Sequence, residues 1–453
     1  MTLDASRLAR LFMLALALVF AVAQPAAAQS VLRDSETELL FRDISRPIIE
    51  AAGLQPSNVQ IVLVQDPEIN AFVSQGQVVY IHTGLINATD NANQLQGVIA
   101  HELGHVVGGH AIRIYDGANA ATKISILSLV LAVAAAAAGA GDAAMGVLMA
   151  GQQAAMGNFL SFTRAQESSA DLAGAAYLGK AGISGKGSLA FFKKLQNQEY
   201  RLAIPQDHSY DRTHPLSSER IASLEQTYQT NPAWNRPTDP ALEARFQRVK
   251  AKLLGYVNPK RATTVYPESD QGIPAHYARA YAYHLGAYPQ KAAAEADALL
   301  KANPDDPFFL ELKGQILLEG GNPEAAIEPL REAVRLAPDQ PMIAVMLGHA
   351  LIASEDPKYF DEAKQVLKKA VNRDNDNPFA WYQLGIVYDR EGDRARASLA
   401  TAERNNLEGE TKLALAAARS AMMGLTPGTP DYLRAQDIAM VSETQLKKDK
   451  KNR

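Results

Sequence analysis

The 453-residue chain contains no cysteine, which excludes disulfide bonds, thiolate nucleophiles and thiolate metal ligands. Any metal site must therefore use histidine, aspartate or glutamate side chains. Concentrated positive charge is also scarce: 45 basic residues stand against 49 acidic ones, and the one dense basic run is the tail at 444–453. This composition argues against nucleic-acid binding. We interpret the tail as a solvated, frayed end.

Residues 1–28 have the composition of a secretory signal peptide. Arg7 and Arg10 form a short basic region, residues 11–22 are apolar, and an Ala-x-Ala-like site precedes Gln29. No cysteine follows the apolar run, so lipoprotein anchoring is not expected. We predict that the chain is exported and processed before Gln29.

An apolar stretch contains the pattern His-Glu-Leu-Gly-His at positions 101–105. Residues four apart share one face of a helix, so His101 and His105 would converge on a single point. Two neutral imidazoles so placed supply half of a tetrahedral zinc site, and Glu102 would lie near enough to handle a water molecule there. The alternative is a solvated helix face, which the apolar flanks disfavour.

A small sheet is predicted before this helix, from residues 59–64, 70–76 and 77–82. Zinc peptidases, in which the histidine pattern is familiar, hold substrates as extended strands. A sheet edge beside the metal helix would therefore supply main-chain pairing partners. We predict Val78–His82 at that edge; an ordinary core strand is the alternative.

A catalytic zinc site of this kind needs a third protein ligand. His110 lies one residue short of the place where one type of zinc peptidase has a third histidine, so we interpret it as a helix-end residue or a neighbour of a ligand. Glu167 is the better candidate, in an alanine-rich helix from about 161 to 178. Asp171 lies four residues later on the same face, where it would accept a hydrogen bond from a ligating imidazole.

A strongly apolar region, about residues 121–150, separates these two motifs. Residues 124–140 approach the roughly 18–20 residues of a spanning helix, but many of them are alanine. We predict a helical hairpin that touches a membrane or a partner; a spanning helix and a buried helix are the alternatives. A spanning helix would separate His105 from Glu167 across the bilayer.

The second half of the chain repeats with a period of 34 residues, as in the pair Gly314 and Gly348. One unit matches the tetratricopeptide pattern with Trp381, Leu384, Gly385, Tyr388 and Ala397. Such units stack into a solenoid whose concave side binds partners. We predict this solenoid for residues 271–443, after a linker with one helix at 231–270.

Together these segments resemble the gluzincin metallopeptidases of the HtpX and CAAX-prenyl-endopeptidase superfamily, in the exported branch with tetratricopeptide repeats (the β-barrel assembly-enhancing protease type). The resemblance rests on residues 97–105, on 164–171, and on Thr-His-Pro at 213–215 followed by Glu219-Arg220. It implies a mainly α fold: an α+β zincin-like domain with a small sheet at 29–230, then an α-solenoid.

The resemblance implies one zinc ion per chain, with His101, His105 and Glu167 as ligands and Glu102 as the general base of a metalloendopeptidase. His214 matches the family's Thr-His-Pro histidine, which contacts the zinc as a fourth ligand or stabilises the transition state. From the residues alone, His214 is equally a plain loop histidine. Arg220 is equally a structural salt bridge or a substrate contact.

The resemblance further implies a periplasmic location, with membrane association left open. Misfolded or stalled outer-membrane proteins would be the substrates, and their assembly complex a partner of the repeats. The alternative is a chaperone or scaffold with minor or latent proteolysis, and a lipid-surface hydrolase is a weaker third choice. The intact ligand set with Glu102 favours the peptidase.

Overall fold

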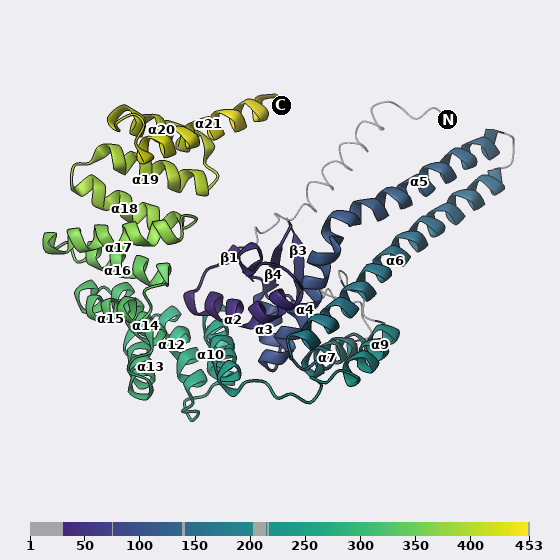
Figure 1. Cartoon of the computed structure of the whole chain (residues 1–453), viewed down its shortest axis with the longest axis horizontal. Coiled ribbons are helices and arrows are strands. Elements are labelled where there is room, and N and C mark those ends of the chain that lie inside the picture. The colour runs from purple at the N-terminus through teal and green to yellow at the C-terminus, as the bar shows by residue number, and fades with distance from the viewer. Residues whose placement is uncertain (1–29, 75, 138–140, 203–213, 215–216, 452–453) are drawn as a thin grey trace, which may run out of the picture.

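The computed structural model describes residues 30–74, 76–137, 141–202, 214 and 217–451. An N-terminal α+β domain carries a long helical hairpin and is followed by a curved solenoid of helix pairs (Figure 1). The predicted fold class is confirmed: mainly α, with a small sheet and an α-solenoid. The predicted signal peptide lies outside the described residues.

A four-stranded mixed sheet belongs to the N-terminal domain. Its strands are β1 (Ser30–Leu32), β2 (Gln60–Gln65), β3 (Ala71–Ser74) and β4 (Val78–His82), in the order β1-β2-β4-β3. Strand β4 pairs in parallel with β2 and antiparallel with β3. The prediction that Val78–His82 forms the edge is therefore wrong, because β4 is hydrogen-bonded on both sides and β3 is the edge strand.

Helices α2 (Ser35–Ala51) and α4 (Ala92–Gly108) share the core with the sheet. The short helices η1 (Pro56–Asn58) and α3 (Thr83–Ala88) lie between the strands and α4 in sequence. Asn91 caps α4 by accepting a hydrogen bond from the backbone N–H of Gln94. The helix ends at Gly109, whose φ of 63° is left-handed and favours glycine.

Helices α5 (His110–Ala137) and α6 (Gly141–Lys180) form the hairpin, which projects away from the N-terminal domain (Figure 1). The hairpin is longer than the region predicted at 121–150, and the helix predicted from 161 is the end of the 40-residue α6. Helices α7 (Lys186–Leu202) and α9 (Ser218–Gln229) complete the domain.

The segment predicted as a linker with one helix contains two, α10 (Pro240–Val257) and α11 (Pro259–Val265). Phe246, Val249 and Leu253 of α10 belong to the core cluster of the N-terminal domain. On the other side, α10 and α11 share a smaller cluster with the first helix of the solenoid. The segment is therefore packed against both halves of the chain.

The solenoid contains the paired helices α12 (Ile273–Leu285), α13 (Pro289–Ala302), α14 (Pro307–Glu319), α15 (Pro323–Leu336), α16 (Pro341–Ala353), α17 (Phe360–Arg373), α18 (Pro378–Arg390), α19 (Arg394–Leu407), α20 (Thr411–Gly424) and α21 (Pro430–Lys451), with η2 (Pro357–Tyr359) before α17. A Cβ at Gly314 would lie 2.4 Å from Leu330, so the 34-residue period places glycine where paired helices touch. Helix α21 continues to Lys451, so the described part of the tail is helical and not frayed.

A buried polar cluster joins the two halves of the chain. We call it the junction network: Asp34, Glu36, Arg248, Lys252 and Tyr277. Lys252 Nζ lies 2.5 Å from Asp34 Oδ2, and the Tyr277 hydroxyl donates a 2.6 Å hydrogen bond to Glu36. Arg248 pairs with Glu36 and also reaches Asp306 of α14 at 2.6 Å. These contacts fix the start of α2 against the solenoid.

Candidate metal centre

Helices α4 and α6 approach closely because glycines stand at their contact. A Cβ at Gly104 would lie 2.6 Å from the carbonyl oxygen of Ala170, and one at Gly174 would lie 3.0 Å from that of Ala100. A Cβ at Gly104 would force the backbone to shift, and one at Gly174 would require its neighbours to move by a few tenths of an ångström. The glycine within the His-Glu-Leu-Gly-His pattern therefore lets Glu167 of α6 reach the two histidines of α4.

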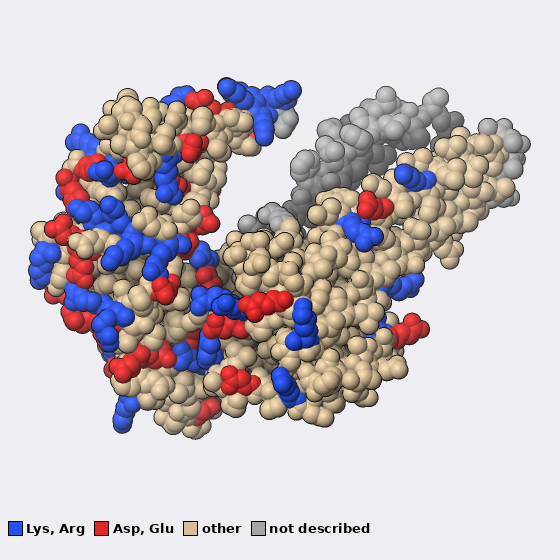
Figure 2. Space-filling model, in the orientation of Figure 1, with Lys and Arg blue, Asp and Glu red and all other residues tan. Residues whose placement is uncertain are grey.

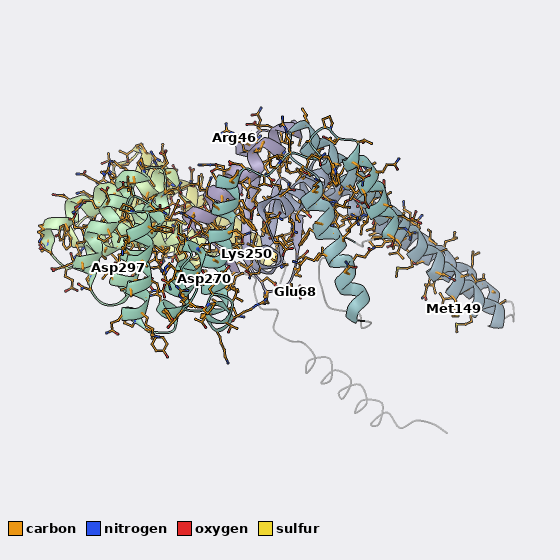
Figure 3. All side chains as sticks on the ribbon, turned by 90° about the horizontal axis from the view of Figure 1, so that it is seen from below. Arg46, Glu68, Met149, Lys250, Asp270 and Asp297 are labelled. Carbon is orange, nitrogen blue, oxygen red and sulfur yellow. The ribbon has the colours of Figure 1, made fainter. Side chains whose placement is uncertain are left out.

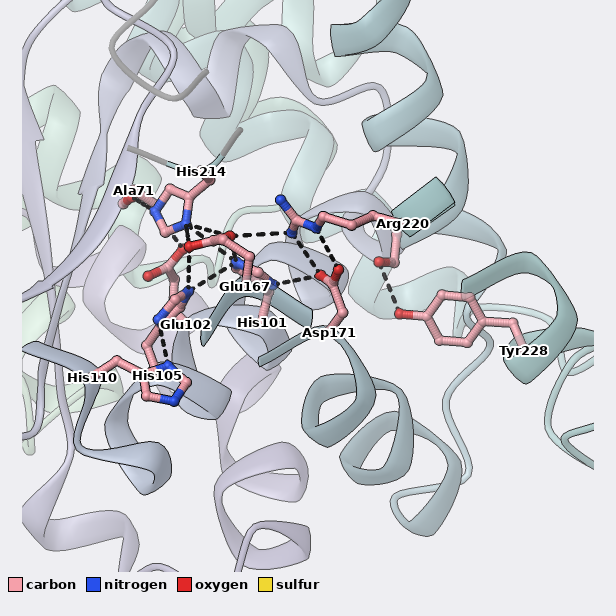
Figure 4. Close-up of polar contacts among 11 residues, drawn as sticks. Ala71, His101, Glu102, His105, His110, Glu167, Asp171, His214, Arg220 and Tyr228 are labelled. Carbon is pink, nitrogen blue, oxygen red and sulfur yellow. Dashed lines mark hydrogen bonds and ion pairs between the residues drawn. The ribbon is translucent and has the colours of Figure 1, made fainter. Parts of the chain in front are cut away.

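Four side chains converge at this crossing: His101, His105, Glu167 and His214 (Figure 4). One ligand atom from each lies within 4.8 Å of the others, and all four residues are buried. The Nε2 atoms of His101 and His105 are 3.1 Å apart, and a Glu167 oxygen lies 3.4 Å from each. His214 Nδ1 lies 3.2 Å from Glu167. Imidazole nitrogens with one carboxylate are a donor set that suits zinc.

Asp171 and Arg220 support these donors from the side. Asp171 Oδ1 lies 3.0 Å from His101 Nδ1, which leaves Nε2 of that ring facing the other donors. Arg220 donates hydrogen bonds of 2.7 and 2.9 Å to Asp171 and lies 3.1 Å from Glu167. The structure thus brings both predicted support residues to the site, and Arg220 has the contacts of a salt bridge.

The two helical histidines differ in their electrostatic surroundings. Burial opposes protonation of His101, but Asp171 and Glu167 outweigh it and raise its pKa to about 10. Burial and the neighbouring histidines lower the pKa of His105 to about 2. Burial alone would raise the pKa of Glu167, yet hydrogen bonds from His101 and His214 hold it well below its ordinary value. A metal ion would displace a proton from His101 on binding.

His110 lies against His105 and not among the four donors. Its Nδ1 atom is 2.9 Å from His105 Nδ1, and its side chain is buried. The left-handed turn at Gly109 makes this contact possible. With its Nδ1 engaged, His105 presents Nε2 to the donor group, so His110 occupies the place predicted for a neighbour of a ligand.

Glu102 is fully buried, and neither carboxylate oxygen has a hydrogen-bond partner among the described residues. The Nε2 atom of His214 lies 3.7 Å from Oε1 of Glu102. Burial raises the pKa of this carboxyl. A buried carboxylate without a donor is unfavourable in a purely structural role, so Glu102 has the environment of a residue that moves protons.

Comparison with known families decides the class of protein. The profile described as Peptidase family M48 matches residues 34–228, and that of the tetratricopeptide repeat matches residues 309–340. Residues 34–228 form a peptidase family M48 domain. The chain is accordingly a metalloendopeptidase with a repeat solenoid behind its M48 domain.

Similar proteins match both parts of the chain. "Beta-barrel assembly-enhancing protease" of Yersinia pestis is 25% identical over 408 residues, which cover 87% of this chain and 81% of that protein. The Escherichia coli K12 protein of the same name is 27% identical over 385 residues, 82% of this chain and 76% of the relative. "Metalloendopeptidase OMA1, mitochondrial" of Bos taurus is 27% identical over 176 residues, 38% of this chain and 33% of the relative.

The edge strand of the M48 domain contributes a main-chain atom that the sequence did not reveal. The carbonyl oxygen of Ala71, at the start of β3, lies 3.3 Å from His214 Nε2. If Nε2 donates to this carbonyl, His214 Nδ1 is left to face Glu167 and His101. No composition signal marks Ala71, because its place depends on which strand forms the edge of the sheet.

Proposed function

We propose that the M48 domain binds one zinc ion through His101, His105 and Glu167, and that the chain is a periplasmic endopeptidase for misfolded or stalled outer-membrane proteins. The observation that carries the proposal is the convergence of these three donors beside the buried carboxylate of Glu102, which has no hydrogen-bond partner among the described residues. The names of the Yersinia and Escherichia relatives support a role in β-barrel assembly.

The mechanism assigns proton transfer to Glu102. Bound zinc would supply Lewis-acid chemistry, which polarises the scissile carbonyl and makes water a better nucleophile. Glu102 accepts the proton from the attacking water and returns it to the leaving amine. Its buried, raised-pKa carboxyl is suited to hold that proton between the two steps.

Substrate would pair with β3 rather than with β4. Among the described elements, β3 is an edge strand of the sheet that contacts α4, and Ala71 lies within reach of His214. An extended substrate segment along this edge would place a peptide bond near Glu102. Access would require His214 to leave the Ala71 carbonyl.

His214 therefore suggests a latent resting state, in which it serves as a fourth ligand through Nδ1. Its proximity to both His101 and Glu167 supports this choice over the transition-state role. In that case His214→Ala raises basal casein cleavage several-fold while zinc content stays unchanged. A plain loss of activity would favour the transition-state role instead.

The solenoid would recruit substrates or the assembly complex. A cavity of about 280 Å³ lies at the boundary between the halves, with Leu32 and Arg33 on the M48 side and Phe379 on α18. Phe379 and Tyr382 are 43% and 44% exposed, and their ring centroids are 6.3 Å apart. Such rings suit unfolded, apolar chain segments.

The test compares wild type with Glu102→Gln for zinc content and for cleavage of casein and unfolded porin. We expect one zinc ion in both proteins and a cleavage rate lower by about 10²–10⁴-fold in the variant, the usual contribution of a general base. Equal cleavage, or the absence of metal from both, would contradict the peptidase. Suppression of porin aggregation by both proteins without cleavage would favour the chaperone alternative.

A further inference from the structure

The outer part of the α5–α6 hairpin exposes large apolar side chains. Among the described residues, His110–Ala135 is the one helix long and apolar enough to cross a membrane, and 11% of its apolar window is buried. The side chains exposed by 52–66% are Ile126, Leu127, Leu129, Val130, Leu131, Val133, Met145, Met149 and Met156. Met149 lies near the free end of the hairpin (Figure 3).

The two helices touch each other through small residues. Ala132 and Ala155 are buried, and a Cβ at Gly151 would lie 2.0 Å from the Cβ of Ser128. A helix pair in water normally buries its large apolar side chains between the helices and exposes polar ones. This hairpin does the reverse, which is the pattern of helices that pack within lipid.

Charge is confined to the base of the hairpin. Between Lys123 and Arg164 the sequence has one charged residue, Asp142. On the face seen in Figure 2, the outer half of the hairpin shows no blue or red side chains. Arg113, Lys123 and Arg164 outnumber Asp116 at the base, and a basic border suits anionic lipid headgroups.

We propose that the outer hairpin inserts into the near leaflet of a lipid bilayer, with both helices entering and leaving on the same side. A protein groove would cover one face, whereas successive positions from 129 to 131 expose apolar side chains around α5. The uncharged part of α5, residues 124–137, rises about 21 Å, less than the roughly 30 Å of hydrocarbon needed to cross. The helix His110–Ala135 reaches the crossing length only with Arg113, Asp116 and Lys123 included. Asp142 at the end of the hairpin also disfavours crossing.

Insertion of the hairpin would hold the metal centre at a fixed distance from the membrane surface. His110 begins α5 thirteen residues before Lys123, a rise of about 20 Å. Because α6 continues from the hairpin to Glu167, the same helix anchors the domain and supplies a metal donor. Resting on the proposed peptidase function, this geometry selects substrates whose unfolded segments emerge within about 20 Å of a membrane surface.

The absence of cysteine allows a direct test with single labels. Leu131→Cys, Ile114→Cys and Met423→Cys are each labelled with an environment-sensitive fluorophore in the otherwise intact chain. They are mixed with phosphatidylethanolamine–phosphatidylglycerol vesicles that carry nitroxide on the acyl chains. We expect a blue shift and strong quenching at 131, weak quenching at 114 near the domain, and none at 423, which is 85% exposed on the solenoid. Equal quenching at all three positions would overturn the proposal.

A second measurement separates lipid from other occupants. In vesicle flotation, Leu127→Gln with Leu131→Gln should lower the bound fraction about tenfold, whereas Met423→Gln should not. Casein cleavage without vesicles should be unchanged, so a failure to float is distinct from a failure of the peptidase. A wild type that does not float, or a soluble dimer that the double substitution abolishes, would overturn insertion.

Discussion

The junction network and the metal centre are both buried clusters of charged side chains, but their charges are satisfied differently. In the junction network, Lys252 lies against Asp34 and Tyr277 donates to Glu36, so each of these carboxylates has a partner. In the metal centre, His101 and His105 turn their Nε2 atoms toward each other, 3.1 Å apart, and Glu102 has no hydrogen-bond partner among the described residues.

This difference separates a structural cluster from a functional one. A network that satisfies its own members stabilises a fixed contact between the halves of the chain. The donors of the metal centre contact one another but converge on one point, so a cation bound there would replace those contacts and couple stability to metal. Substitutions in the two clusters should consequently affect different measurements.

The largest expected effect is on the metal centre. Glu167→Gln removes the negative donor but keeps the side-chain shape, so zinc content should fall from about one per chain to near zero and proteolysis to background. With zinc at about 1,000 times its Kd, wild type should gain roughly 4 kcal/mol that the variant lacks. Metal analysis and thermal unfolding with and without chelator measure both. A variant that retains zinc would show that Glu167 is not a ligand.

The next effect is on the junction network. Lys252→Met leaves Asp34 and Glu36 buried without that cation, and loss of one partner of a buried pair costs about 3–5 kcal/mol. Urea unfolding should register this loss, while zinc affinity stays at the wild-type value. Lys291→Met, at a pair with Glu268 whose two side chains are 60% and 70% exposed, is the matched control and should change stability little. Reduced zinc affinity in Lys252→Met would break the distinction between the clusters.

The smallest expected effect is on zinc affinity, and it distinguishes a residue that orients a ligand from a residue that binds the metal. Asp171→Asn keeps the shape but weakens the hydrogen bond to His101 and the pair with Arg220, so zinc affinity should fall about 10–100-fold. Competition with a chromophoric chelator measures this change. Activity should return at saturating zinc; if it does not, Asp171 has a role beyond orienting His101.

Local sequence patterns predicted many residues of the candidate site. The spacing of His101, Glu102 and His105 depends only on helix periodicity, and so does that of Glu167 and Asp171. His110 was likewise placed by counting residues. Glu167 was assigned to the same site because the histidine pattern needs a third ligand and the pair of Glu167 and Asp171 offers one, but only the fold shows that two segments more than 60 residues apart meet.

Helix ends were less well predicted where tertiary packing overrides propensity. The helix predicted from about 161 to 178 covered only the end of α6. In the structure, contact of Gly151 with Ser128 of α5 accompanies one continuous α6. The segment at 231–270 was predicted to be a linker because it contains several prolines. In the structure, Pro240 and Pro259 lie at helix starts, and the core contacts of the segment are with residues distant in the sequence.

The sequence by itself determined the donor types, their helical spacing, the repeat period and the exclusion of thiolate chemistry, because these depend on residue identity and on positions a few residues apart. Only the tertiary structure decided that β3 is the edge strand, that Ala71 meets His214, and that the start of α2 pairs with α10 and α12. A strand's composition does not specify its neighbours, and a buried charge does not name its partner. The neighbours of a strand and the partners of a buried charge are both fixed by packing between distant segments. This packing forms the metal centre and the junction network.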